Sequence, residues 1–159
     1  MSANYFNNLN RIVELLLKDE IVLNNIENLK TEIQRSKEPF LWEVINLDVY
    51  KQDLPPIIES GWIFVLKKNT PSVAHYHPNS IQHTVMIEGK GKVNVSDQLR
   101  DLKSFNPSNE DIWIVIDKDV PHEFFPYDQD MVVVSFHTCI PEDLVEIKCE
   151  GHEHRIYEK

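Results

Sequence analysis

The pattern of apolar residues divides the chain into two parts near residue 38. In the first part, apolar residues recur at steps of three and four, and neither proline nor glycine interrupts residues 1–38. This spacing predicts an amphipathic helix with one apolar stripe. Asp19 and Lys30 fall on or near the stripe, so the pattern fits one long helix or two shorter ones. The stripe is formed by Leu9, Ile12, Val13, Leu16, Leu17, Leu23, Ile26, Leu29 and Ile33.

An apolar stripe has to be covered in the folded protein. It packs either against one side of the domain that follows or against a second chain, as the arm of a dimer. We therefore predict an N-terminal helical segment, residues 1–38, followed by a second domain, residues 39–159.

From Glu38 onward the apolar positions alternate, and β-branched and aromatic residues gather in short runs separated by turn-forming sequences. Such runs, with no helical pattern between them, predict an antiparallel β-sandwich or barrel. After Pro141 the chain becomes polar, and residues 150–159 are expected to form an edge strand or a tail. The predicted strands are 40–47, 61–68, 83–88, 91–96, 111–116, 121–125 and 131–138.

Composition narrows the class of protein. The formal net charge of −10 argues against a protein that binds the phosphate backbone of nucleic acids. No apolar run is long enough to span a bilayer, and the N-terminal sequence MSANYFNNLN lacks the features of a signal peptide. Cys139 and Cys149 form neither a disulfide framework nor a zinc knuckle. We expect a cytoplasmic protein with no nucleic-acid or membrane partner.

The sequence 73-VAHYHPNSIQHTVMIEGKGKV-93 carries the candidate chemistry. On a strand, residues two apart point to the same face, so His75 and His77 can reach one metal ion. An HxH pair alone is weak evidence for a metal site. Here a further histidine, His122, opens a later predicted strand directly after Pro121.

These residues resemble the two motifs of the cupin superfamily, G-x5-H-x-H-x3/4-E-x6-G and G-x5-P-x-G-x2-H-x3-N. His75 and His77 match the histidines of the first motif, and Gly89 matches its closing glycine. His122 matches the histidine of the second motif, and the resemblance spans residues 40 to 140. It implies a mainly β double-stranded β-helix, or jelly-roll barrel, with a metal ion held inside by His75, His77 and His122, and a homodimer.

Five positions depart from the cupin motifs. Asn69 stands in place of the opening glycine of the first motif. In the second motif, Asp117 and Asp119 replace the proline and glycine, and Pro126 replaces the final asparagine. We expect these four changes to alter loop geometry more than the metal site. Gln82 stands where the first motif has glutamate, and this change removes a charged ligand.

The loss of that charge affects which metal and which ligand are expected. Three neutral imidazoles and an amide leave the charge of a divalent ion uncompensated, which favours Fe²⁺, Zn²⁺ or Ni²⁺ and an anionic small molecule. Gln82 either binds the ion weakly through its side-chain oxygen or hydrogen-bonds a water bound to it.

Other residues are weaker candidates. His83 should face away from Gln82, as a surface or inter-sheet histidine, unless a one-residue register shift makes it a ligand. His137 either lines the interior as a general base or packs in the core or at the rim, and Met86 is expected in the pocket wall. The second HxH pair, His152 and His154, lies in the polar tail and is expected to be solvated.

The sequence therefore predicts a metal-dependent cupin that acts on a small, anionic molecule, with dioxygenase-like chemistry if the metal is iron. Cupins include dioxygenases, isomerases, lyases and decarboxylases, so the family resemblance implies no single reaction. The alternative is a cupin that binds or senses a small molecule without catalysis, because Gln82 replaces a residue that often completes the ligand set.

Overall fold

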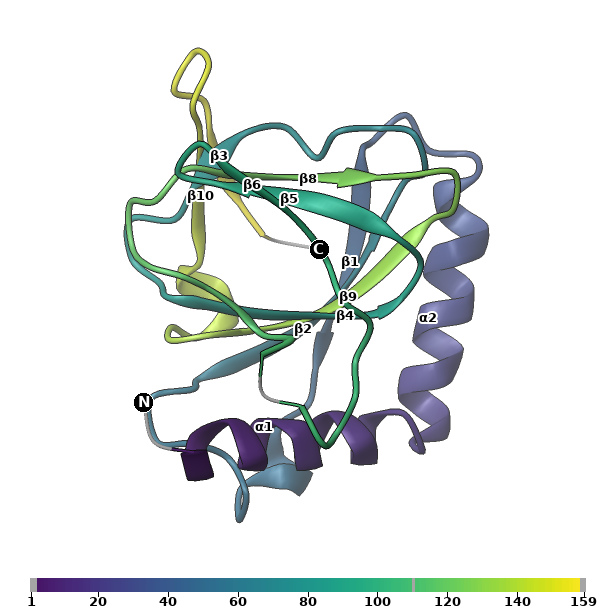
Figure 1. The fold of residues 1–159 in the computed structure, drawn as a ribbon, viewed down its shortest axis with the longest axis vertical. Helices are drawn as coiled ribbons and strands as arrows, with labels where there is room; N and C mark the ends of the chain where they lie inside the picture. Colours follow the sequence, from purple (N-terminus) through teal and green to yellow (C-terminus); the bar gives the residue numbers. More distant parts are fainter. Residues whose placement is uncertain (1–2, 110, 158–159) are drawn as a thin grey trace.

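The computed structural model describes residues 3–109 and 111–157. The N-terminal stripe forms two helices, α1 (Ala3–Leu16) and α2 (Glu20–Ile33), of which α1 runs along the bottom of the view and α2 along its right side (Figure 1). Asp19 explains the break, because its side chain accepts a hydrogen bond of 2.9 Å from the backbone N–H of Ile21 and caps α2. No helix in the described ranges is long and apolar enough to cross a membrane.

The strands form two antiparallel sheets. One has the order β1-β2-β9-β4-β7 and the other the order β11-β10-β3-β8-β5-β6. This arrangement confirms the prediction of a mainly β jelly-roll fold with N-terminal helices. The strands are β1 (Phe40–Ile45), β2 (Ser60–Leu66), β3 (His75–Tyr76), β4 (Gln82–Glu88), β5 (Gly91–Val95), β6 (Gln98–Asp101), β7 (Ile114–Ile116), β8 (His122–Pro126), β9 (Met131–His137), β10 (Val145–Lys148) and β11 (His154–Ile156), with short 3₁₀ helices η1 (Asp48–Tyr50) and η2 (Pro141–Asp143).

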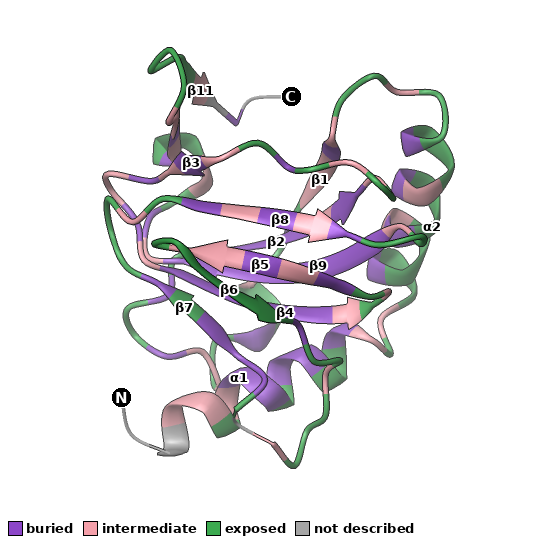
Figure 2. Ribbon diagram, turned by 45° about the horizontal axis from the view of Figure 1, so that its top comes forward, coloured by how far each residue is buried: buried purple, intermediate pink, exposed green. Residues whose placement is uncertain are grey.

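The five-stranded sheet is buried on both faces. Its inner face meets the six-stranded sheet, and its outer face is covered by α1 and α2, so β9 is buried along its whole length (Figure 2). On the outer face, Ile63, Val85 and Phe136 pack in one cluster with the helix residues Leu9 and Ile12. The apolar stripe is therefore covered within the chain, except for Leu23, which is exposed. Because the helices and the sheet share this core, the division at residue 38 stays a prediction.

Three parts of the strand prediction need correction. β7 begins at Ile114 rather than at residue 111, and β6 was not predicted. The residues after Pro141 contain a strand, β10, that the polar composition did not reveal. β10 pairs with β3 on one side and with β11 on the other. The C-terminal segment therefore forms part of the barrel and lies beside the strand that carries His75.

The turns explain why some departures from the cupin motifs are tolerated. Asn69 and Asp119 have φ values of 54° and 64°. This left-handed conformation is the one that glycine favours, and Asn and Asp adopt it more readily than other residues. Gly89 has a φ of 97°, and a Cβ atom there would lie 2.7 Å from the backbone oxygen of Asp130, so this position requires glycine.

Candidate metal centre

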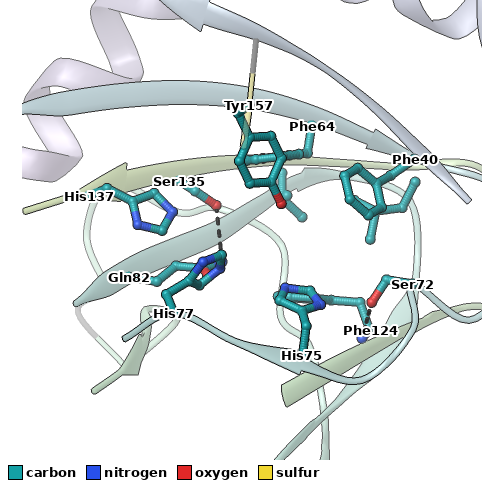
Figure 3. Close-up of a pocket in the computed structure, with 12 residues that line it drawn as sticks. Phe40, Phe64, Ser72, His75, His77, Gln82, Phe124, Ser135, His137 and Tyr157 are labelled. Carbon is teal, nitrogen blue, oxygen red and sulfur yellow. Dashed lines mark hydrogen bonds between the residues drawn. The ribbon is translucent and has the colours of Figure 1, made fainter. Parts of the chain in front are cut away.

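Three histidines from two adjacent strands converge between the sheets. His75 on β3 pairs with His122 on β8, and His77 follows β3 directly. One ring nitrogen of each lies within 4.8 Å of those of the other two, and all three side chains are buried. Figure 3 shows His75 and His77 at one wall of a cavity. We call these residues the three-histidine cluster; the described residues contain no other such group of His, Cys, Asp and Glu.

Backbone carbonyls fix the orientation of each ring in the cluster. Nδ1 lies 2.7 Å from the oxygen of Val73 in His75, 2.8 Å from that of Val145 in His77, and 3.0 Å from that of Val120 in His122. Because a carbonyl only accepts hydrogen bonds, Nδ1 carries the proton in all three rings and Nε2 keeps its lone pair. Metal-binding histidines in proteins are held in the same way.

One ligand atom is buried without any partner. Nε2 of His122 has no solvent exposure and no hydrogen bond. Leaving a buried polar atom unpaired is costly, and a metal ion would remove that cost. Three imidazole nitrogens with free lone pairs fit a divalent ion such as Zn²⁺, Fe²⁺ or Ni²⁺.

The backbone at Val73 is strained. Its φ is 76°, a left-handed value that β-branched residues very rarely adopt. The carbonyl of Val73 is the one that holds Nδ1 of His75. Strain of this kind costs about 1–3 kcal/mol and is often found at functional sites.

Burial keeps the rings of His77 and His122 neutral. It lowers the pKa of His77 to about 3 and that of His122 well below the ordinary value, and the neighbouring histidines lower both further. The hydrogen bond to Val145 and the nearby Gln82 oppose the shift at His77 in part. A neutral imidazole is the form that binds metal.

The cavity beside the cluster contains about 360 Å³ of empty space, including its opening. Both sheets contribute to its walls, which are mainly aromatic with a few polar groups, as in many small-molecule sites. Met86 is not among the lining residues and packs in the core between the sheets. The walls are formed by Phe40, Phe64, Leu66, Ser72, His75, His77, Gln82, Phe124, Val133, Ser135, His137 and Tyr157.

Gln82 lines this cavity with its amide held by two hydroxyl groups. Its Nε2 donates to Oγ1 of Thr84 over 2.7 Å. It also donates to Oγ of Ser135 over 3.4 Å (Figure 3). These bonds occupy the amide nitrogen and leave the amide oxygen to face the cavity. Gln82 therefore presents an acceptor close to His77.

His137 is paired with a hydroxyl group, whereas each ring of the cluster is paired with a carbonyl. Nδ1 lies 2.7 Å from Oγ of Ser80, and the oxygen of Ile81 lies 3.4 Å from the same Oγ. Ser80 has one hydroxyl proton, which it donates either to that oxygen or to Nδ1, so both neutral tautomers of His137 fit these distances. Burial lowers the pKa of His137 well below its ordinary value, so the ring is neutral. His137 lines the cavity, and its role as a general base stays a prediction.

His83 lies on the other face of the sheet, beneath α1. It is fully buried, so the expectation of a surface or inter-sheet histidine is wrong. Its Nε2 is 2.9 Å from the hydroxyl of Tyr5 on α1, and burial lowers its pKa. His83 is not a member of the three-histidine cluster. His152 and His154 are exposed, in agreement with the prediction that they are solvated.

Sequence reasoning missed Glu146 on β10. This carboxylate is 2% exposed, and its Oε1 lies 3.5 Å from Nε2 of His75. The hydroxyl of Tyr157 donates to Oε1, and Nε of Arg155 lies 3.4 Å from Oε2. Burial and the nearby carboxylate raise the pKa of Tyr157 well above its ordinary value, so the phenol keeps its proton. The alternation 145-VEIK-148 was the one sequence signal for this strand.

Comparison with solved structures identifies the fold. No protein-family model and no curated protein matches the sequence. The Lactobacillus farciminis oxalate decarboxylase in its formate complex is 15% identical, with a TM-score of 0.54, over 72% of this chain and 32% of that chain. The Schizosaccharomyces pombe Cnp3 cupin domain is 7% identical, with a TM-score of 0.50, over 64% of this chain and 66% of that one. Oxalate oxidase in complex with glycolate is 10% identical, with a TM-score of 0.50, over 77% of this chain and 57% of that one.

These matches cover the barrel at low sequence identity, and they span between a third and two thirds of the matched chains. They show that the chain has the cupin fold, so the resemblance seen in the two sequence motifs is confirmed at the level of the fold.

Proposed function

We propose that the protein binds a divalent transition-metal ion through His75, His77 and His122 and acts on a small, anionic molecule in the adjoining cavity. The observation that carries this proposal is that the Nε2 atoms of three buried histidines lie close together, while Nδ1 of each ring is bonded to a carbonyl. Each ring is turned by a backbone carbonyl, and the three nitrogens lie within 4.8 Å of one another. No requirement of core packing explains why three buried rings share this arrangement.

The chemistry we favour is dioxygenase-like. An iron(II) ion bound there would supply redox chemistry with O₂ and a positive charge for an acidic substrate. The chain's own groups have complementary roles. The ring of His137 can hydrogen-bond a substrate oxygen or hydroxyl, the amide oxygen of Gln82 can accept from a substrate hydroxyl, and the aromatic walls exclude water.

The charge around the cluster is consistent with an anionic ligand. Glu146 brings one negative charge and Arg155 one positive charge, so these two side chains offset each other. The charge of a divalent ion on three neutral imidazoles then remains for the ligand. Two cupins of similar fold were solved with small carboxylates, formate and glycolate, which belong to the class of ligand proposed here.

Metal content tests the first half of the proposal. We expect stoichiometric iron, zinc or nickel in the purified protein by elemental analysis, and loss of that metal in His75→Ala and His122→Ala. His154→Ala is the matched control, because it removes an exposed histidine from the other HxH pair. Equal metal content in His122→Ala and the control would overturn the metal site.

Oxygen consumption tests the second half. With the iron-loaded protein, we expect a small carboxylic acid from a panel of hydroxy, keto and amino acids to support O₂ uptake that His122→Ala abolishes. An acid that raises the melting temperature of the loaded protein without O₂ uptake or any product would instead indicate a binding or sensing cupin.

A further inference from the structure

The wall of the cavity changes from polar to apolar along the strands of the five-stranded sheet. Residues paired across neighbouring strands lie side by side in rows, and every second row faces the barrel interior. Gln82 pairs with His137, so the first row is polar. Ser135 lies two residues before His137 on β9, and Val133 lies two residues before Ser135. Val133 pairs with Phe64, so this later row is apolar.

The next row and the facing part of the six-stranded sheet are also apolar. Phe40 pairs with Leu66, and both line the cavity. Phe124 lies two residues after His122 on β8, so its side chain faces the interior on the same side of the strand. Ser72 adds a neutral hydroxyl there, and its oxygen accepts a hydrogen bond of 2.8 Å from the backbone N–H of Phe124.

The cavity therefore has two ends of different chemistry. Figure 3 shows His77, Gln82 and His137 together on one side and Phe40 and Phe124 on the other. The ring centroids of His77 and His137 lie 5.2 Å apart, so the polar groups of both sheets meet at the same end. We call Phe40, Phe64, Leu66, Phe124 and Val133 the apolar end, and His77, Gln82, Ser135 and His137 the polar end.

The apolar end offers no cation to a ligand. Among the described residues that line the cavity, none is lysine or arginine. Arg155 contacts Phe40, with its guanidinium carbon 5.0 Å from the ring centroid, but it does not line the cavity. It also pairs with Glu38 and Glu146, at 3.7 and 3.4 Å. A carboxylate placed at the apolar end would therefore be buried without a cation, which is costly.

We propose that the substrate is a small monocarboxylic acid with a hydrocarbon group, and that the apolar end selects it over dicarboxylic acids. The carboxylate binds at the three-histidine cluster, and the hydrocarbon group packs against Phe64, Phe124 and Val133. Burial of its apolar surface favours this orientation. The proposal rests on the proposed function, because the metal ion at the three-histidine cluster holds the acid.

Two hydroxy acids of equal shape test the preference. Leucic and malic acid share the same α-hydroxy acid head, and the two terminal methyl groups of leucic acid stand where malic acid has two carboxylate oxygens. In calorimetric titrations of the zinc-loaded full chain, we expect leucic acid to bind more tightly than malic acid by about 100-fold or more. Equal dissociation constants, or tighter binding of malic acid, would overturn the proposal.

Two neighbouring valines on β9 test the apolar end itself. Val133→Thr keeps the shape of the side chain and places a hydroxyl at the apolar end. We expect it to weaken binding of leucic acid by about tenfold and to change that of malic acid by no more than about twofold. Val134→Thr is the matched control, because Val134 is equally buried but belongs to the core under the helices. It should leave both dissociation constants unchanged.

Leu66→Lys supplies the missing cation. Leu66 is buried and lines the apolar end. We expect this variant to bind malic acid more tightly than the wild type by about tenfold or more, and leucic acid less tightly. Circular dichroism and melting temperature show whether each variant is folded. If Leu66→Lys does not fold, Val133→Thr and its control decide, and wild-type affinity for leucic acid in folded Val133→Thr overturns the proposal.

The outcomes separate this proposal from the proposed function. If the wild type binds zinc through His122 but prefers malic acid, or binds neither acid, the substrate class is wrong and the metal site stands. If the wild type binds no zinc, or if His122→Ala binds zinc and leucic acid as the wild type does, the proposed function fails as well.

Discussion

The two faces of the five-stranded sheet are both buried along its central strand β9 but differ in what they hold. On β4, Gln82 and Thr84 belong to the inner face, whereas His83 and Val85 lie under the helices. The inner face carries hydroxyl, amide and imidazole groups around a cavity. The outer face is packed with aliphatic and aromatic side chains from α1 and α2. One face is thus a candidate site, and the other is a core.

Burial and a lowered pKa do not distinguish the histidines of the two faces. Burial lowers the pKa of His83 on the outer face as well as those of His77 and His137, which line the cavity on the inner side of the sheet. The partner of each ring nitrogen does distinguish them. Nε2 of His83 is occupied by the hydroxyl of Tyr5, whereas in the three-histidine cluster a carbonyl occupies Nδ1 and Nε2 is left for a ligand.

The largest effect should come from the outer face. Phe136 is fully buried there and packs against Trp113, with ring centroids 6.1 Å apart. Phe136→Ala should lower the free energy of unfolding by about 3–5 kcal/mol, because it leaves a large cavity. Urea denaturation measures this loss. In the folded fraction, the metal dissociation constant should stay that of the wild type; a large rise would mean that the two faces are not independent.

On the inner side of the sheet, we expect a bound metal ion to stabilise the folded protein. A metal ion at one hundred times its dissociation constant should raise the free energy of unfolding by about 2.7 kcal/mol, because it binds only the folded chain. A chelator should reverse the gain, and His77→Ala should abolish it. Thermal unfolding with and without Zn²⁺ measures both effects. Equal metal-induced stabilisation of His77→Ala and the wild type would place the ion elsewhere.

The pH dependence of the free energy of unfolding can isolate the contribution of His83 from those of the other buried histidines. Burial lowers the pKa of His83 in the folded protein, so below the ordinary value of about 6.5 the unfolded chain binds a proton that the folded chain does not. Stability is therefore lost as the pH falls below that value. In metal-free protein, His83→Gln should flatten this loss by up to about 1.4 kcal/mol per pH unit.

The nearby phenol does not complicate this measurement. Burial raises the pKa of Tyr5 to about 12, so it stays protonated throughout the series. The buried inner-face histidines are present in both proteins and cancel in the difference. Urea denaturation between pH 4.5 and 7.5 gives the two slopes. Parallel slopes would contradict the idea that His83 is neutral because it is buried under α1.

The residues of the site that depend on spacing along the sequence could be predicted, whereas those that depend on the packing of distant segments could not. His75, His77 and His122 could be found because the two motifs keep their order and spacing, and strand alternation placed His83 opposite Gln82. The burial of His83 beneath α1 could not be predicted, because it depends on how α1 packs on a sheet that is formed by residues far along the chain. Tyr5 and His83 are 78 positions apart.

Glu146 was missed for a related reason. A glutamate in a short, polar C-terminal segment is ordinarily solvated, and only the pairing of β10 with β3 turns it inward beside His75. The alternation in 145-VEIK-148 is a signal for a strand, but it does not specify that this strand pairs with β3. The polar composition after Pro141 therefore described the exposed residues of the hairpin correctly and concealed its one buried carboxylate.

The smallest expected effect tests the hydrogen bond between Tyr5 and His83, which distinguishes His83 from the histidines of the three-histidine cluster. Tyr5→Phe removes the hydroxyl that contacts Nε2 of His83 and should cost about 1 kcal/mol of stability in urea. The cost should disappear in the His83→Gln background, because a double-mutant cycle isolates the pair. Tyr127→Phe is the control, since its hydroxyl bonds Asp101 at an exposed site and should matter less. Equal costs of Tyr5→Phe in both backgrounds would show that its hydroxyl does not act through His83, which would remove the distinction drawn between the two faces.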